Sequence, residues 1–513
     1  MTFFESLLAL LAVAVLLLQI SRRLAIPYPT MLAAAGVLLA LVPGAPRIGL
    51  DPRTALPLFV APALVDAAFD FPIAAIRSLW RPLFALAVLA VLLSAGAVAW
   101  LGVTMAGLPL YAALALGAIV APPDAAAATA ILRSVRMPRR SVTVLKGESL
   151  LNDATALLLF SAALSLQQHG AINGGLALRL GIAAPGGVLL GIVLARVVRY
   201  VIPFVSGTLG GNLFEFLASF GVWLIAERLG LSAVLCLVAF AMSLARAANL
   251  IIRPRTRIHS YAVWDSAVFL LNVLAFLLMG LQARSIVGAM APERLRAALW
   301  FAATVVICLT VVRLAWVLLY TRIACHIRWL RGEFEPASWR HGVLVGWCGM
   351  RGLVTLATAF ALSPEFPQRD LIVLTAFAVV LATLVIQGLT LAPLVRLLRL
   401  DRDDGSSAQL AAARAQLAAA ALDALQSDTG PQADNWRYTF ETARAAVAPD
   451  ADSASLQEWR RLGLAAMHRQ RDMLDGLRDA QRIDSDMFLT LQAELDFSEV
   501  ALIREEERRM EES

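Results

Sequence analysis

The feature that most constrains this fold is a series of apolar stretches long enough to cross a lipid bilayer. A helical crossing needs about 20 mostly apolar residues, and thirteen such stretches, some short or interrupted, precede residue 400. They lie near 3–20, 25–43, 55–71, 82–104, 108–132, 148–168, 175–198, 213–228, 231–248, 265–284, 297–321, 341–363 and 371–397. Because 59% of the residues are hydrophobic and 16% charged, an ordinary soluble globule is excluded. The sequence therefore predicts an all-α polytopic membrane protein.

Arginine is concentrated in every second loop between these stretches, for example in 133–140 and 253–257. By the positive-inside rule these loops are cytoplasmic, which places the N-terminus outside and the C-terminus inside. The first stretch runs directly into Arg22 and Arg23, so we interpret it as a retained span and not as a removed signal peptide. We expect multi-pass insertion in a bacterial inner (plasma) membrane, in contact with membrane lipid.

The composition changes at about residue 400, where the segment 401–407 (DRDDGSS) introduces sequence rich in Ala, Gln, Arg and Glu with helical periodicity. We predict two domains, a transmembrane domain over 1–400 and a cytosolic α-helical domain over 401–513. A solvated bundle that aids folding or dimer contact is favoured for the second domain over a regulatory role, and both interpretations stay open.

Two of the stretches carry signals that break a helix. Pro122 and Pro123 precede Asp124, and they remove backbone donors and disfavour helical geometry before them. Seven stretches later, the segment 346–352 (GWCGMRG) contains three glycines and Arg351. Broken helices at matching places in inverted repeats are how many transporters build a substrate site near the bilayer midplane. We therefore predict two discontinuous helices that flank such a site.

Asp124 and Asp153 are carboxylates within apolar stretches, where ionisable groups are costly and mark sites for a cation or a proton. Ser149 and Asp153 share a helix face, with Asn152 beside them. Their hydroxyl, amide and carboxylate oxygens can converge on one small cation, and hard alkali cations prefer such oxygen ligands.

Glu148 lies about 100° around the helix from Ser149. A buried carboxylate needs a partner, so we expect a structural ion pair between Glu148 and Arg351. Arg313 is expected to be an interhelical anchor, with Glu215 as its candidate partner.

Several motifs together resemble the bacterial sodium/proton exchanger branch of the monovalent cation/proton antiporter superfamily. They are 22–29 (RRLAIPYP), the PPD break, 147–153 (GESLLND), 269–280 with Asn272, and the Arg-Gly break followed by 353–357 (LVTLA). The resemblance implies that Asp153 binds cation and proton in turn, that Asp124 lines the site, and that Glu148 and Arg351 hold helices together. With this resemblance, the predicted site is a Na⁺ site at Asp153, Asp124 and Ser149. It also implies inverted repeats with two crossing discontinuous helices, a homodimer, alternating access, and electroneutral exchange because Asn152 is not a second acid.

Two positions depart from the pattern of that family. Pro123 replaces a threonine that often precedes the aspartate of the broken helix, which changes the ligand set. Asp66 stands where a glutamate is common in the third span, and we include it among the predicted cation and proton ligands.

Two other functions remain open. The same fold could exchange K⁺, or Li⁺, instead of Na⁺, and two intramembrane aspartates could form a protease dyad. No GxGD, HExxH or GxSxG motif accompanies the aspartates, and no GxxxxGK[ST] loop indicates ATP use. We therefore expect a carrier that contributes to pH homeostasis and sodium transport, and not an enzyme, with no cofactor and no nucleic-acid partner.

Overall fold

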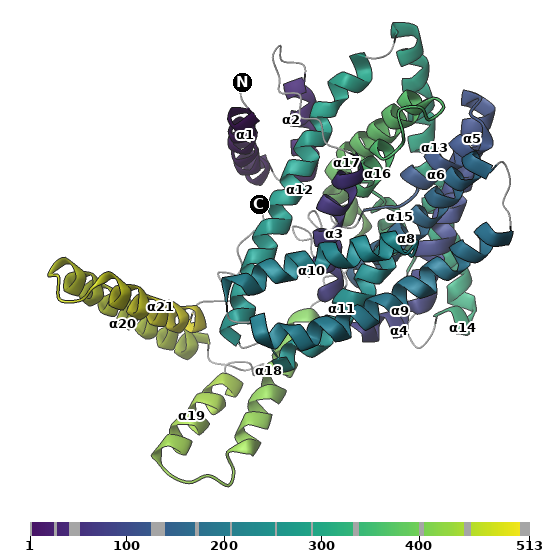
Figure 1. The fold of residues 1–513 in the computed structure, drawn as a ribbon. Helices are drawn as coiled ribbons and strands as arrows, with labels where there is room; N and C mark the ends of the chain where they lie inside the picture. The colour runs from purple at the N-terminus through teal and green to yellow at the C-terminus, as the bar shows by residue number, and fades with distance from the viewer. Residues whose placement is uncertain are drawn as a thin grey trace. The chain divides into compact units, whose positions relative to one another are not determined.

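The computed structural model describes most of the chain as helix (Figure 1). The described residues are 3–24, 28–40, 52–124, 139–169, 174–205, 208–251, 254–288, 291–331, 338–399, 405–445 and 453–502. Within these residues there are α-helices and one π-helical segment and no strand, so the predicted all-α fold class is confirmed. The chain divides into two compact units, Met1–Arg402 and Asp403–Glu512.

The helices of the first unit follow the predicted apolar stretches. They are α1 (Phe3–Leu24), α2 (Tyr28–Ala40), α3 (Pro52–Phe69), α4 (Ile73–Phe84), the π-helical η1 (Ala85–Leu89), α5 (Ala90–Ala106), α6 (Leu110–Val120), α8 (Arg139–His169), α9 (Gly174–Val205), α10 (Leu209–Arg228), α11 (Ala233–Ile251), α12 (Pro254–Gly288), α13 (Pro292–His326), α14 (Arg328–Arg331), α15 (Trp339–Trp347), α16 (Leu353–Phe360) and α17 (Arg369–Leu398). Each predicted stretch overlaps at least one of these helices, and 341–363 overlaps two, α15 and α16. Residues 25–27 and 41–43 of the second stretch and 125–132 of the fifth lie outside the described residues.

Six helices of the described residues are long and apolar enough to cross a membrane. They are Ile73–Ala106, Ser141–Gln168, Gly181–Val205, Thr256–Leu278, Pro292–His326 and Arg369–Leu398. The first of these helices begins before the predicted stretch at 82–104. Its N-terminal part is the amphipathic helix α4, which carries Arg77 and Arg81 and continues through η1 into α5.

Local sequence explains several helix ends. Gly107 ends α5 in the left-handed conformation, with φ of 61°, which glycine adopts at no steric cost. Pro292 begins α13 at the first helical position, where its missing N–H is not needed. Ser338 precedes α15, and its side chain accepts a hydrogen bond from the His341 N–H.

Buried apolar side chains form two main clusters in the first unit. One cluster draws on α5, α6, α13, α15, α16 and α17, and the other draws chiefly on α3, α10 and α11, with α9 packed against α11. Small residues let helices approach closely within each cluster. An added Cβ would overlap the Ala95 carbonyl oxygen at Gly117 of α6, and the Cys236 carbonyl oxygen at Gly191 of α9.

The second unit consists of two helical hairpins. Helix α18 (Gly405–Ala424) packs against α19 (Pro431–Ala445), and α20 (Ser453–Asp479) packs against α21 (Ser485–Leu502). Arg471 of α20 donates to Asp496 at 2.5 Å and to Glu499 at 2.5 Å, both on α21. These largely exposed ion pairs and polar surfaces are typical of helices in water.

The close approach of α5 and α6 yields a prediction about packing. Gly117→Ala should lower the melting temperature of the detergent-purified protein, because overpacking a tight contact costs about 1–3 kcal/mol. Gly96→Ala is the matched control, since nothing lies within 4 Å of a Cβ added there on α5. Equal melting temperatures for the two variants would contradict the close approach.

Candidate functional site

The two predicted breaks meet and satisfy each other's backbone groups. Arg351, between α15 and α16, donates from Nε to the Val120 carbonyl at 3.0 Å and from Nη2 to the Ala121 carbonyl at 3.4 Å. The Asp124 N–H donates to the Met350 carbonyl at 2.7 Å. Arg351 is fully buried. Since carbonyls freed inside a bilayer must find donors, these contacts join the end of α6 to the break between α15 and α16. The continuation of the first predicted discontinuous helix beyond Asp124 lies outside the described residues.

Asp124 also stabilises the start of α16. Its Oδ2 accepts a hydrogen bond from the Leu353 N–H at 3.2 Å, and a carboxylate is favourable at a helix N-terminus because of the unpaired N–H groups and the helix dipole. A Cβ at Gly352 would overlap Asp124 Oδ2. Glycine is therefore required at 352 by this approach, a role that the sequence signals only as a glycine before an apolar helical run.

Asn152 links α8 to the first break. Its Nδ2 donates to the Pro123 carbonyl at 2.7 Å, and the side chain is fully buried. This hydrogen bond leaves Asn152 Oδ1 as a buried oxygen with no hydrogen-bond partner in the described part of the chain. A buried acceptor without a donor is unfavourable, and a cation or a proton donor would relieve it.

Asp153 follows Asn152 and is 7% exposed. It lies close enough to Asp124 for the two carboxylates to repel each other. Within the described ranges, no arginine, lysine or histidine forms a salt bridge with Asp153. Ser149 lies one helical turn earlier on α8 and is partly buried. The structure thus brings Asp124, Asn152 and Asp153 together where the two breaks meet.

The partner of Glu148 is a correction to the sequence analysis. Arg313 of α13 binds Glu148 through both guanidinium ends, from Nη1 to Oε1 at 2.5 Å and from Nη2 to Oε2 at 3.0 Å. Both side chains are buried. The predicted Glu148–Arg351 pair is wrong, because Arg351 is directed at the carbonyls of Val120 and Ala121 at the C-terminal end of α6.

Glu215 is likewise not the partner of Arg313. Glu215 Oε2 accepts hydrogen bonds from Ser260 Oγ at 2.6 Å and from Trp264 Nε1 at 2.7 Å, both on α12. The expected Arg313–Glu215 contact is therefore also wrong.

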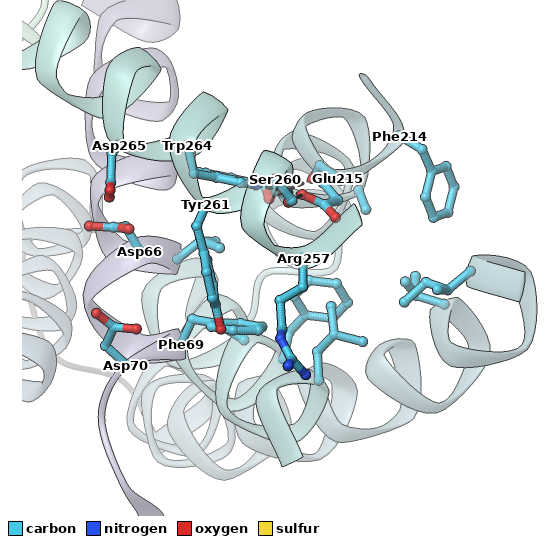
Figure 2. A pocket seen from close by; sticks show the side chains of 18 residues that line it. Asp66, Phe69, Asp70, Phe214, Glu215, Arg257, Ser260, Tyr261, Trp264 and Asp265 are labelled. Atoms are coloured by element: carbon cyan, nitrogen blue, oxygen red, sulfur yellow. Dashed lines mark hydrogen bonds between the residues drawn. The ribbon is translucent and has the colours of Figure 1, made fainter. Parts of the chain in front are cut away.

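Asp66 lies on the wall of a cavity that Glu215 also lines (Figure 2). The residues that line this cavity do not include Asp124 or Asp153. A role for Asp66 in cation binding stays a prediction. The sequence analysis did not single out Asp265, which shares that wall, because it stands at the edge of an apolar stretch.

The Glu148–Arg313 pair can be tested by a double-mutant cycle. Glu148→Ala and Arg313→Ala should each destabilise the protein by about 3–5 kcal/mol, because each strands a buried charge. The double variant should lose less than the sum of the two, as measured by thermal unfolding in detergent. Strictly additive losses would show that the two side chains do not interact, and Glu227→Ala combined with Arg313→Ala is the additive control.

Comparisons with known proteins show which family the chain resembles. A family model described as "Sodium/hydrogen exchanger, transmembrane" matches residues 8–397. An uncharacterised Na⁺/H⁺ exchanger of Mycobacterium tuberculosis is 31% identical over 96% of this chain and 95% of its own length. A sodium, potassium, lithium and rubidium/H⁺ antiporter of Bacillus pumilus is 29% identical over 71% of this chain and 57% of its own length.

A solved structure has the same fold. The sodium proton antiporter MjNhaP1 from Methanocaldococcus jannaschii superposes with a TM-score of 0.60 at 17% identity, over 78% of this chain and all of that chain. Together with the family match, this confirms the resemblance and the fold class and leaves no support for the protease alternative. The chain belongs to the sodium/hydrogen exchanger family, whose members are membrane-spanning cation/proton antiporters and not enzymes.

Proposed function

We propose that this protein exchanges Na⁺ for H⁺ at Asp153. The observation that carries the proposal is the group formed by buried Asp153, partly buried Asp124 and the unpartnered Asn152 Oδ1 at the meeting point of the two breaks. A buried carboxylate is unfavourable while charged and unpaired. Either a proton or a small cation relieves that cost, and the two compete for the same oxygens.

Asn152 positions the site and sets its charge. Its hydrogen bond to the Pro123 carbonyl fixes the amide, so that Oδ1 is the atom left for a cation. Ser149, one turn away, adds a hydroxyl oxygen. Because Asn152 is neutral, one cation replaces one proton at Asp153 and the exchange is electroneutral.

Alternating access is a movement of one packed bundle against another. The two main hydrophobic clusters provide such bundles, with the crossing breaks in one and α3, α10 and α11 in the other. The contacts of Arg351 and Asp124 make the two broken helices move together. Rigid-body movement around a central site is typical of transporters built from repeats. We also propose a homodimer in a bacterial plasma membrane, with the N-terminus outside and the residue 401–513 tail in the cytoplasm.

A K⁺/H⁺ exchanger is the second candidate. The name of the Bacillus pumilus relative includes sodium, potassium, lithium and rubidium, and oxygen ligands suit each of these ions. Separate additions of Na⁺, Li⁺ and K⁺ to vesicles with a pH-sensitive dye inside would rank them.

Asp153→Asn tests the site. The amide binds neither a proton nor Na⁺ as a carboxylate does, so Na⁺-dependent proton movement in purified liposomes should fall to background. The variant should remain folded, as judged by its melting temperature. Glu365→Gln, at an exposed position in the turn after α16, is the matched control and should retain activity. Near-normal exchange by Asp153→Asn would refute the assignment.

Competition at one carboxylate predicts a specific pH dependence. The Na⁺ concentration for half-maximal rate should rise as the pH falls, approaching about tenfold per unit for one competing proton, and saturating Na⁺ should restore the rate. Turnover should be indifferent to a membrane potential set with potassium and valinomycin. A half-saturation that is independent of pH would contradict the shared site, and strong voltage dependence would contradict electroneutral exchange.

A further inference from the structure

A cavity of about 400 Å³ lies among α3, α9, α10, α11 and α12 (Figure 2). It sits at one end of these helices, since Asp70 follows the last residue of α3, and Arg257 and Glu215 lie near the first residues of α12 and α10. Its volume is in the range of sites for small organic molecules, about 300–1,000 Å³.

The charged groups of the cavity are mostly carboxylates. Four acids line it, and Arg257 is the cationic side chain among the lining residues. Figure 2 shows Asp66, Asp70 and Asp265 on one side of the Tyr261 ring and Arg257 on the other. A cavity lined by one sign of charge concentrates ions of the opposite sign. The acidic side of Tyr261 therefore favours a cation.

The fourth acid, Glu215, is held in place. Its Oε2 accepts from Ser260 Oγ at 2.6 Å and from Trp264 Nε1 at 2.7 Å. Both donors belong to buried residues of α12. Two neutral donors therefore fix the orientation of the Glu215 carboxylate.

Aromatic rings form another part of the wall. Tyr261 meets Phe69 edge to face, with centroids 6.1 Å apart, and Trp264 stacks on Phe216 at 4.3 Å. Aromatic faces attract ammonium groups, most strongly where water is excluded. The remaining wall is aliphatic and includes Val198, Ile202 and Leu244.

The side chains that line the cavity indicate the chemical class of the ligand. An alkali ion gains nothing from aliphatic and aromatic surface and fills little of about 400 Å³. An ammonium group near Asp66 and Asp265, joined to an apolar tail, would use both the charge and the apolar wall. We propose that this cavity binds an organic ammonium ion with an apolar or aromatic tail, at a site separate from Asp153.

The test uses the purified full chain and two ligands that differ in charge. Calorimetry should detect saturable binding of 4-phenylbutylammonium with a stoichiometry of one. The neutral 4-phenylbutanol has the same tail and should bind at least about tenfold more weakly, since it lacks the charge. Equal binding of the alcohol would overturn the proposal.

Substitutions of lining residues test whether the ligand binds in this cavity. Asp265→Asn, at an exposed position, should raise the Kd for 4-phenylbutylammonium about tenfold, and Tyr261→Leu should raise it several-fold while Tyr261→Phe retains the ring and the affinity. Glu227→Gln, exposed on the same helix as Glu215, is the matched control and should bind as the parent does. Asp153→Asn should also bind normally. Loss of binding in Asp153→Asn, or an unchanged Kd in both Asp265→Asn and Tyr261→Leu, would overturn the proposal.

Discussion

The fold depends on how backbone groups are satisfied where two membrane helices are interrupted. Pro122 and Pro123 end α6, so the carbonyls of Val120 and Ala121 lie at its C-terminal end, where helix carbonyls lack intrahelical N–H partners. In a bilayer, no water replaces those partners. Arg351 supplies donors to both carbonyls from a break 230 residues away in the chain. The break after α6 is thus stabilised by Arg351 in the break between α15 and α16.

That arrangement divides the buried charges into two sets. Arg313 and Glu148 neutralise each other through two hydrogen bonds, and Arg351 is surrounded by carbonyl oxygens. Asp153 shares its surroundings with Asp124 and the amide of Asn152 instead of a cationic side chain. The protein stabilises its permanent charges with fixed partners, and it leaves near Asp153 the position that a mobile ion would occupy under the proposed exchange.

The acids outside that site lie in different surroundings. Glu215 is fixed by Ser260 and Trp264, and Asp66 and Asp265 lie beside aromatic and aliphatic walls. The site at the breaks offers carboxylate and amide oxygens, whereas the cavity of about 400 Å³ is mostly lined by apolar surface. Carboxylates of one chemical type therefore lie in different chemical surroundings, because the neighbouring side chains differ.

The sequence by itself determined the helical spans, the two breaks and the two aspartates near them, because span length, proline chemistry and the cost of charge in a bilayer act locally along the chain. Only the tertiary structure decided which residues meet. Glu148 pairs with Arg313, 165 residues away, and Gly352 is needed because Asp124 Oδ2 approaches it from another helix. Asp66 faces a cavity whose other walls come from four further helices. Such contacts depend on how helices rotate and cross, and periodicity within one helix does not specify the partner on the next.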